Sequence, residues 1–235
     1  MHYSAILFDL DGTLLPMDTE AFVKAYFHAL YKEVAPFGVA PDAFKTAMFA
    51  GVKAMMGNDG TRSNADAFWE AFTTLAGVQR EVVEPICDTF YTQGFHGARA
   101  ATGDNPLARE AVKLARQKAD RVILATNPLF PLAGQRTRLS WIGLAPEDFD
   151  LVTYYATDRF CKPNPAYYVD ICERMGLNPA NCLMIGNDDR EDMMAASSLG
   201  MDTYLVTNWR LPHAEKPWQG DQGTFEEMLD MLRSL

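Results

Sequence analysis

The chain has 235 residues, of which 48% are hydrophobic and 22% are charged, and its formal net charge is −10. These values are typical of a globular protein with one large or two unequal domains, and they exclude a disordered or fibrous chain. Because the acidic chain has no run of Lys or Arg, we expect no nucleic-acid partner.

The cysteines and the apolar stretches indicate the compartment. Cys87, Cys161, Cys172 and Cys182 form no CxxC pair and no zinc-type spacing with His, so reduced and mostly buried thiols are expected. There is no leader-like start and no uninterrupted apolar stretch of about 18 residues. We therefore expect a cytoplasmic protein without a membrane partner. The sequence leaves monomer and homodimer open.

The first apolar run, residues 5–8, ends abruptly at Asp9, Leu10, Asp11 and Gly12. Such a run predicts a strand buried on both faces, whose carboxyl end is where parallel sheets bind ligands. Two carboxylates this close together require a cation or a shared proton. The alternative is an Asp-Gly turn that closes a hairpin.

Residues from about 19 to 95 carry Ala, Phe, Met and Trp at helical spacing, interrupted by a loop at residues 57–60. This block predicts an inserted helical subdomain.

After residue 105 the pattern alternates between strands and helices. Strands are expected over residues 122–125, 151–155, 182–185 and 203–207. Helices are expected over residues 106–118 and 225–232, in a segment that ends at about Met175, and directly after the acidic run 186–192. This alternation predicts a doubly wound parallel α/β sheet with right-handed crossovers.

Polar residues follow four of the expected strands, and their order resembles that of the haloacid dehalogenase superfamily. The phosphatase-type members of that family carry an Asp-x-Asp-x-Thr signature, a Thr or Ser, a Lys and an acidic cluster. Here these are residues 9–13, Thr126, Lys162 and residues 186–192. The resemblance covers residues 3–207.

The resemblance implies a Rossmann-like core and a helical cap placed between the first and second motifs. The core would comprise residues 1–15 and 104–235, and the cap residues 16–103. The cap would close over small substrates, with hinges near residues 15–16 and 101–103.

The implied reaction is Mg²⁺-dependent hydrolysis of a small-molecule phosphate monoester through an aspartyl-phosphate. By resemblance, Asp9 attacks phosphorus, and Asp11 protonates the leaving group and later deprotonates water. Asp9, the backbone carbonyl of Asp11 and the acidic cluster would bind Mg²⁺.

Thr126, Asn127 and Lys162 are the expected phosphate-binding residues. The Thr126 hydroxyl and the neighbouring backbone N–H groups are suited to a phosphoryl oxygen, although a Thr at this position also fits a helix cap. A single Lys is usually a solvated surface residue, and only the order of the motifs favours a site role for Lys162.

The acidic cluster departs from the family pattern, because Asn187 stands where an Asp is usual. A carboxylate should bind Mg²⁺ more strongly than an amide, which favours Asp188 as the ligand and leaves Asn187 as the second choice. Asp192 is expected to orient Lys162 or a metal-bound water. The other acids, Asp189 and Glu191 especially, are explained by favourable interaction with a helix N-terminus.

Several related functions stay open at this point. A dehalogenase would not need Asp11, whereas a phosphosugar mutase, or a phosphonate hydrolase with a Schiff-base lysine, would use the same core. Candidates for that lysine are Lys24, Lys32, Lys45 and Lys53. A noncatalytic phospho-ligand-binding regulator is the remaining alternative. Within the expected cap loop, Arg62 is a candidate contact for a second anionic group of the substrate.

Overall fold

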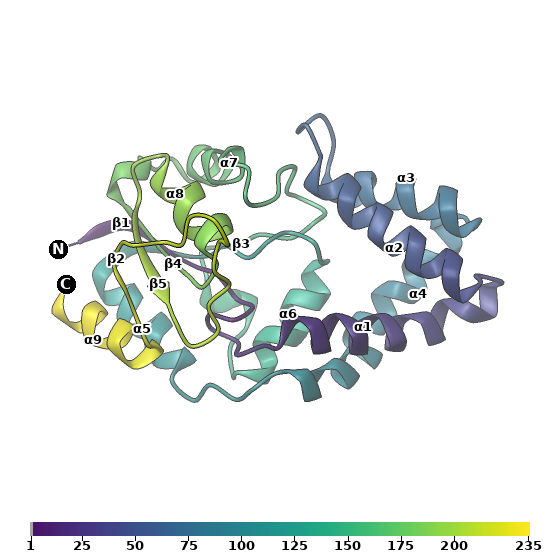
Figure 1. Ribbon diagram of the computed structural model, residues 1–235, viewed down its shortest axis with the longest axis horizontal. Helices are drawn as coiled ribbons and strands as arrows, with labels where there is room; N and C mark the ends of the chain where they lie inside the picture. The colour runs from purple at the N-terminus through teal and green to yellow at the C-terminus, as the bar shows by residue number, and fades with distance from the viewer. Residues whose placement is uncertain (1) are drawn as a thin grey trace.

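The computed structural model describes residues 2–235, and a six-stranded sheet forms its centre (Figure 1). The strand order is β3-β2-β1-β4-β5-β6, and every neighbouring pair is parallel. The strands are β1 (Tyr3–Phe8), β2 (Ala119–Leu124), β3 (Leu151–Val152), β4 (Cys182–Gly186), β5 (Asp202–Val206) and β6 (Gln222–Gly223). The predicted doubly wound α/β sheet is confirmed.

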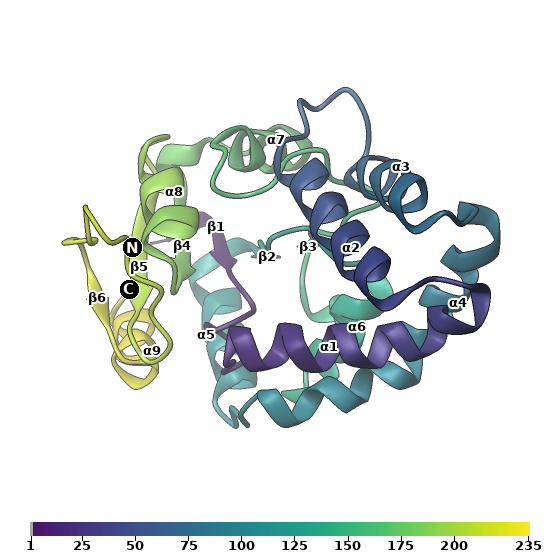
Figure 2. The same cartoon turned by 45° about the vertical axis from the view of Figure 1, so that its right-hand side comes forward.

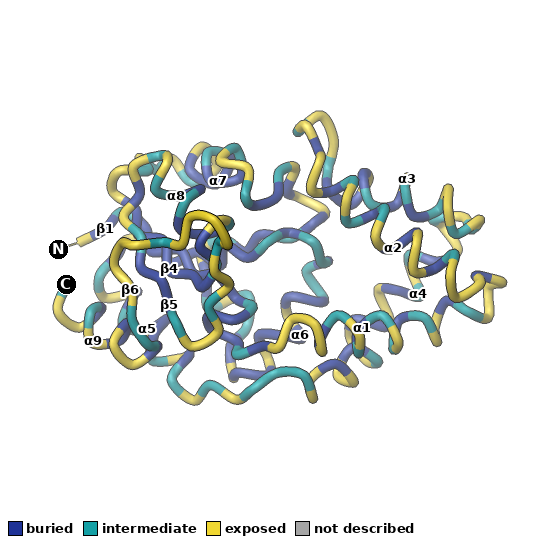
Figure 3. The backbone as a smooth tube through the Cα atoms, in the orientation of Figure 1, coloured by how far each residue is buried: buried dark blue, intermediate teal, exposed yellow. Residues whose placement is uncertain are grey.

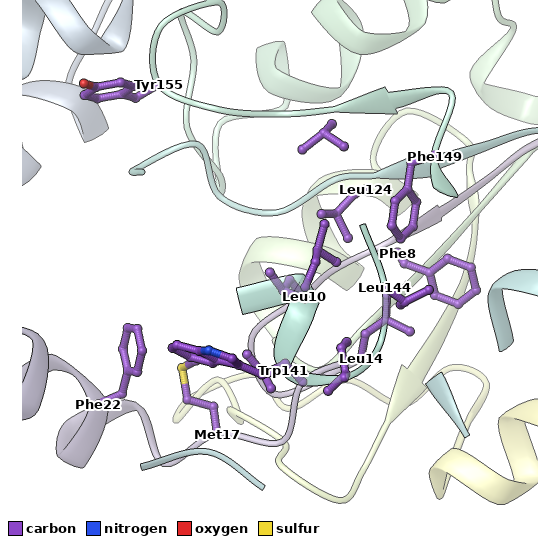
Figure 4. Packing of buried hydrophobic residues seen from close by; sticks show 14 of the residues in the cluster. Phe8, Leu10, Leu14, Met17, Phe22, Leu124, Trp141, Leu144, Phe149 and Tyr155 are labelled. Carbon is purple, nitrogen blue, oxygen red and sulfur yellow. The ribbon is translucent and has the colours of Figure 1, made fainter. Parts of the chain in front are cut away.

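Helices cover both faces of the sheet, as parallel strands require. On one face, Ala5 and Leu7 of β1 pack with side chains of α7 (Ala166–Met175) and with Ala195 of α8 (Ala195–Ser197). On the other face, Ile6 and Phe8 belong to the cluster that includes α5 (Ala108–Lys118), α6 (Leu132–Trp141) and α9 (Phe225–Ser234). Side chains that alternate along β1 therefore pack into two hydrophobic cores, one on each face of the sheet. Figure 4 shows Phe8 and Leu124 packing with Leu144 and Phe149 on the second face.

The inserted block folds as a helical cap beside the carboxyl ends of the strands (Figure 2). It contains α1 (Thr19–Val34), α2 (Pro41–Met56), α3 (Asn64–Ala76) and α4 (Arg80–Thr92), followed by 3₁₀ turns over Gly94–Ala101. Its interior is aromatic, with the rings of Tyr26, Tyr91 and Phe95 in mutual contact. Figure 3 shows the contrast between the buried central strands and the exposed outer surfaces of α2 and α3.

The two segments that join the cap to the core run side by side. Met17 pairs with Thr102 in an antiparallel bridge, and the Gly103 N–H donates to the Pro16 carbonyl at 2.8 Å. The Asp18 N–H also donates to the Ala101 carbonyl at 3.2 Å. The cap thus leaves and re-enters the core at one place.

Two details differ from the sequence prediction. The strand expected over residues 151–155 ends at Val152, because the Tyr154 N–H donates to Asp158 Oδ2 at 3.0 Å and the chain turns there. The acidic run begins a π-helical turn over Asp189–Met194, and only Ala195–Ser197 continue it as an α-helix. All four cysteines are buried and free of disulfides, as expected. Over residues 2–235, no helix has the length and apolar character needed to cross a membrane.

Candidate active site

Lys162 joins two carboxylates below the carboxyl ends of β1 and β4. Its Nζ donates to Asp9 Oδ1 at 2.9 Å and to Asp192 Oδ1 at 2.6 Å. The side chains of Lys162 and Asp192 are 1% and 2% exposed, and that of Asp9 is 10% exposed. Residues far apart in sequence therefore form a buried charge cluster.

The protonation of this cluster is set by burial and by charge. Burial raises the pKa of Asp9 to about 8, with Asp192 and Asp11 acting in the same direction, whereas Lys162 acts to lower it. Burial alone would lower the pKa of Lys162, but Asp192 and Asp9 hold it well above its usual value. Lys162 therefore opposes the effect of burial and favours the ionised form of Asp9.

Asp192 is fixed from its other side by backbone groups. Its Oδ2 accepts the N–H groups of Asn187 and Asp188, both at 3.0 Å. The carboxylate lies directly against Gly186, where a Cβ would overlap it. Glycine at this position therefore allows Asp192 to fold back under the end of β4 and hold Lys162.

The hydroxyl of Thr13 contacts both Asn187 and Asp9. Thr13 Oγ1 lies 3.1 Å from Asn187 Oδ1 and 3.4 Å from Asp9 Oδ2. Asn187 Nδ2 donates to the Trp209 carbonyl at 2.6 Å, which fixes the orientation of the amide. Gly12 has a φ of 85°, and a Cβ there would overlap Asn187 Nδ2. The turn after β1 thus needs glycine both for its conformation and for this close approach.

Asp188, unlike Asn187, bonds to backbone groups of its own segment. Its Oδ1 accepts the N–H groups of Arg190 at 2.8 Å and Glu191 at 2.7 Å, so it caps the π-helical turn. Asp189 is also engaged away from the cluster around Asp9: it accepts from Arg210 Nε and from the Trp218 N–H, at 2.9 and 2.8 Å.

Asp11 forms an ion pair with the buried Arg138, a residue that the sequence did not indicate. Arg138 of α6 is 0% exposed and donates to Asp11 Oδ2 and to Gln135 Oε1. Its guanidinium carbon lies 4.2 Å from the centre of the Phe130 ring. Asp11 Oδ1 is buried and has no hydrogen-bond partner among the described residues. Arg138 therefore fixes Oδ2 of Asp11, whereas Oδ1 is available for a hydrogen bond to a ligand.

Thr126 and Asn127 follow β2 beside this cluster. The Thr126 carbonyl accepts from Thr153 Oγ1 at 2.6 Å and from the Tyr167 hydroxyl at 3.0 Å, which fixes the backbone at this point. Asn127 Nδ2 donates to Glu191 Oε2 at 3.0 Å and to the Lys162 carbonyl at 3.3 Å. Asn127 thereby links the segments after β2, β3 and β4.

Arg62 lies apart from these contacts. Its side chain is 45% exposed and its guanidinium pairs with Glu70 of α3, so the ion pair found for Arg62 among the described residues is not with the residues at the strand ends. The same loop instead docks the cap on the core through Asn64, which is fully buried. The Asn64 N–H donates to the Asp158 carbonyl at 2.9 Å, and Asn58 Nδ2 donates to Asn64 Oδ1 at 2.9 Å.

The oxygen atoms near Asp9 suit a magnesium ion that keeps several waters. Within residues 2–235, no three Asp, Glu, His or Cys side chains gather as a ready-made cage. However, Mg²⁺ is usually held by one or two carboxylates together with substrate and water. Asp9 Oδ2 and Asn187 Oδ1, both within reach of Thr13 Oγ1, provide such a sparse set of oxygen donors.

Comparison with known proteins agrees with this geometry. A family model described as haloacid dehalogenase-like hydrolase matches residues 3–200. The chain therefore belongs to the haloacid dehalogenase-like hydrolases. The family and the enzyme class expected from the motif order are both confirmed.

Similar proteins are distant in sequence. The chain is 24% identical to pyrophosphatase PpaX of Bacillus velezensis, over 97% of this chain and 94% of the relative. It is 26% identical to phosphoglycolate phosphatase of Neisseria gonorrhoeae, over 88% and 80%. It also matches acyl-CoA dehydrogenase family member 10 of Mus musculus at 24% identity, over 87% of this chain but only 18% of that protein.

A solved structure supports the fold. The HAD-hydrolase YfnB from Bacillus subtilis, described with bound magnesium, superposes with a TM-score of 0.61. The two chains are 21% identical, and the match covers 99% of this chain and 100% of the other.

Proposed function

We propose that the protein catalyses Mg²⁺-dependent hydrolysis of a small-molecule phosphate monoester, with Asp9 as the nucleophile. The observation that carries this proposal is the placement of Lys162 Nζ between Asp9 Oδ1 and Asp192 Oδ1. A buried cation next to a carboxylate at the end of a strand can neutralise both the nucleophile and an incoming phosphoryl group. The phosphatase names of two relatives support the same reaction class.

In this proposal, Asp9 attacks phosphorus and forms an aspartyl-phosphate, while Lys162 and Thr126 hold phosphoryl oxygens. Oδ1 of Asp11, which has no hydrogen-bond partner within residues 2–235, delivers a proton to the leaving oxygen. It then accepts a proton from the water that cleaves the acyl-phosphate, and Asp9 is regenerated. A bound Mg²⁺ would neutralise charge on the phosphoryl group and reduce its repulsion by Asp9.

We propose Asp9, the Asp11 carbonyl and Asn187 as the groups that hold this metal. Asn187 Oδ1 lies near Asp9, whereas Asp188 Oδ1 is already bonded to two backbone N–H groups. The geometry thus favours the amide, although ligand charge alone favours Asp188. Asn187→Leu should weaken Mg²⁺ binding, measured by calorimetry, more than Asp188→Asn does.

The cap is proposed to span residues 16–103 and to move as a unit on the paired segments at Met17 and Thr102. In this proposal the substrate is a small phosphorylated metabolite of the cytoplasm, a reducing compartment that agrees with the four free thiols.

Phosphate release tests the proposed function. The substrates are small phosphomonoesters, p-nitrophenyl phosphate among them, assayed with Mg²⁺ and with EDTA. Release should require the metal and should disappear in Asp9→Asn. Release that survives in Asp9→Asn or in EDTA would contradict the proposal.

A further inference from the structure

An apolar cavity of about 190 Å³ lies where the cap meets the core. All four cap helices contribute to its wall, and the core closes it with Leu129, Phe130 and Tyr155. No lining side chain carries a formal charge, and two of its three tyrosine hydroxyls, those of Tyr26 and Tyr91, satisfy each other at 2.6 Å. The cavity thus offers a ligand aromatic and aliphatic surface and few polar groups.

The cavity adjoins the reaction centre through Phe130. One face of this ring lies 4.2 Å from the Arg138 guanidinium carbon, and Arg138 donates to Asp11. Leu129, which also lines the cavity, has its N–H bonded to the carbonyl of Asn127 at 2.8 Å. Leu129 and Phe130 of the core wall therefore belong to the segment after β2 that carries Thr126 and Asn127, two of the residues proposed to bind phosphate.

A second, open hollow lies beside this cavity. An open groove of about 1180 Å³ shares Val23, Phe27 and Phe49 with the inner cavity. Its core side includes Trp209, whose carbonyl accepts from Asn187 Nδ2. The two hollows thus lie next to each other along α1 and α2 and share part of their walls.

Native interiors seldom leave a void of this size empty, because its walls lose their packing contacts. An engineered apolar cavity of about 150 Å³ in another protein stays dry and binds benzene. A sugar placed here would find only a few polar groups, such as the Trp69 Nε1–H and the Tyr155 hydroxyl, so most of its hydroxyl groups would lack partners, which is costly. The cavity therefore suits an apolar group.

We infer that this cavity receives the leaving group of the substrate, and that the substrate is the phosphate monoester of a neutral, apolar alcohol with about six to eight carbon atoms. The inference rests on the proposed phosphatase function, in which the leaving oxygen lies beside Asp11. The phosphoryl group binds at Lys162, and the hydrocarbon extends past Phe130 into the cap.

A matched pair of esters tests this inference. Cyclohexylmethyl phosphate and glucose 6-phosphate both release a primary alcohol attached to a six-membered ring, but only the second ring carries hydroxyl groups. The expected kcat/KM is higher for cyclohexylmethyl phosphate by about 100-fold, as burial of several methylene groups implies. Equal or faster turnover of glucose 6-phosphate would overturn the inference while leaving the phosphatase function intact.

Substitutions inside and outside the cavity give the structural control. Val52 of α2 lines the cavity, whereas Val82 of α4 is 46% exposed. Val52→Trp should lower the ratio of kcat/KM for cyclohexylmethyl phosphate over ethyl phosphate by about 10-fold, since the side chain occupies the same space. Val82→Trp should leave this ratio unchanged. An equal ratio in both variants would contradict the assignment.

Two further measurements keep the test decisive. If Val52→Trp does not fold, Val52→Ala enlarges the cavity and should shift the preference toward a bulkier ester, and an unshifted preference would count against the inference. Cyclohexylmethanol should raise the melting temperature of the wild-type protein, whereas glucose should not. A protein that releases phosphate from no ester, p-nitrophenyl phosphate included, would refute the proposed function and with it this inference.

Discussion

Arg138 donates to Oδ2 of Asp11 from a position where no part of the arginine side chain is exposed. Gln135 Oε1 accepts from the same guanidinium, and Phe130 lies against it. These contacts hold the carboxyl group that we propose as the acid and base, so Arg138 is a positioning residue rather than a group that reacts.

Arg138→Met should lower kcat by about 100-fold, because a small displacement of a reacting group has an effect of this size. KM should change little, since Arg138 has no direct contact with phosphate in the proposed site. Steady-state kinetics on p-nitrophenyl phosphate separate the two constants, and circular dichroism checks the fold. A rise in KM at constant kcat would show that Arg138 binds substrate instead.

Lys162→Met should remove activity and also destabilise the protein. Asp9 and Asp192 would then be buried carboxylates without their cation, which typically costs about 3–5 kcal/mol. Urea denaturation measures this loss of unfolding free energy. Lys162→Arg should not restore activity, because the larger planar group does not fit a site built for one ammonium. Unchanged stability in Lys162→Met would contradict the ion cluster described above.

We expect the stabilising contribution of Asp189 to be lost in acid. Burial raises its pKa, but hydrogen bonds from Arg210 and from the N–H groups of Trp218 and His213 outweigh burial and lower the pKa below its usual value. A carboxylate with a lowered pKa in the folded state stabilises the protein above its unfolded pKa of about 3.9. That stability is lost as the pH falls through the folded pKa.

Asp189→Asn should therefore lower the melting temperature at pH 7 by several degrees, at roughly 2–4 °C for each kcal/mol lost. The difference from wild type should shrink as the pH falls below about 4, where the unfolded chain first takes up a proton at Asp189, and should vanish below the lower pKa of the folded state. Calorimetry over this pH range measures the difference. A gap that stays constant with pH would show that the charge of Asp189 does not matter.

Asn64 should be needed for docking of the cap. Its side chain accepts from Asn58 and donates to Cys161 Sγ at 3.4 Å, all without exposure to solvent. Asn64→Leu leaves these groups unpaired and should destabilise the protein by about 2 kcal/mol. Asp59→Ala, on the exposed part of the same loop, serves as the control, with an effect within about 0.5 kcal/mol. Equal effects of the two substitutions on urea unfolding would contradict this role.

Much of the fold could be predicted because β1, β2 and β4 are apolar runs that end in polar residues. Parallel strands bring their carboxyl ends to one edge, so the meeting of Asp9, Lys162 and Asp192 follows from topology. The two-residue strand β6 carries no such pattern. The length of β3 depends on a turn held by Asp158, which a β-branched and aromatic run does not reveal.

The rest of the candidate site depends on tertiary contacts. Arg138 lies 127 residues from Asp11 in sequence, within a helix that also contains Gln135 and Arg136, and no local pattern marks it. The orientation of Asn187 depends on the Trp209 carbonyl, which lies in a loop without regular structure. Side chains of this kind become visible only when distant segments are placed together.

The central claim is that Asp9 becomes phosphorylated during turnover. Wild-type protein is mixed with p-nitrophenyl phosphate and Mg²⁺, quenched in acid within one turnover and digested, and the peptides are examined by mass spectrometry. We predict one phosphoryl group on the N-terminal peptide, located at Asp9 by fragmentation and missing from Asp9→Asn. Phosphate release without this adduct, or an adduct on another residue, would contradict the proposed mechanism.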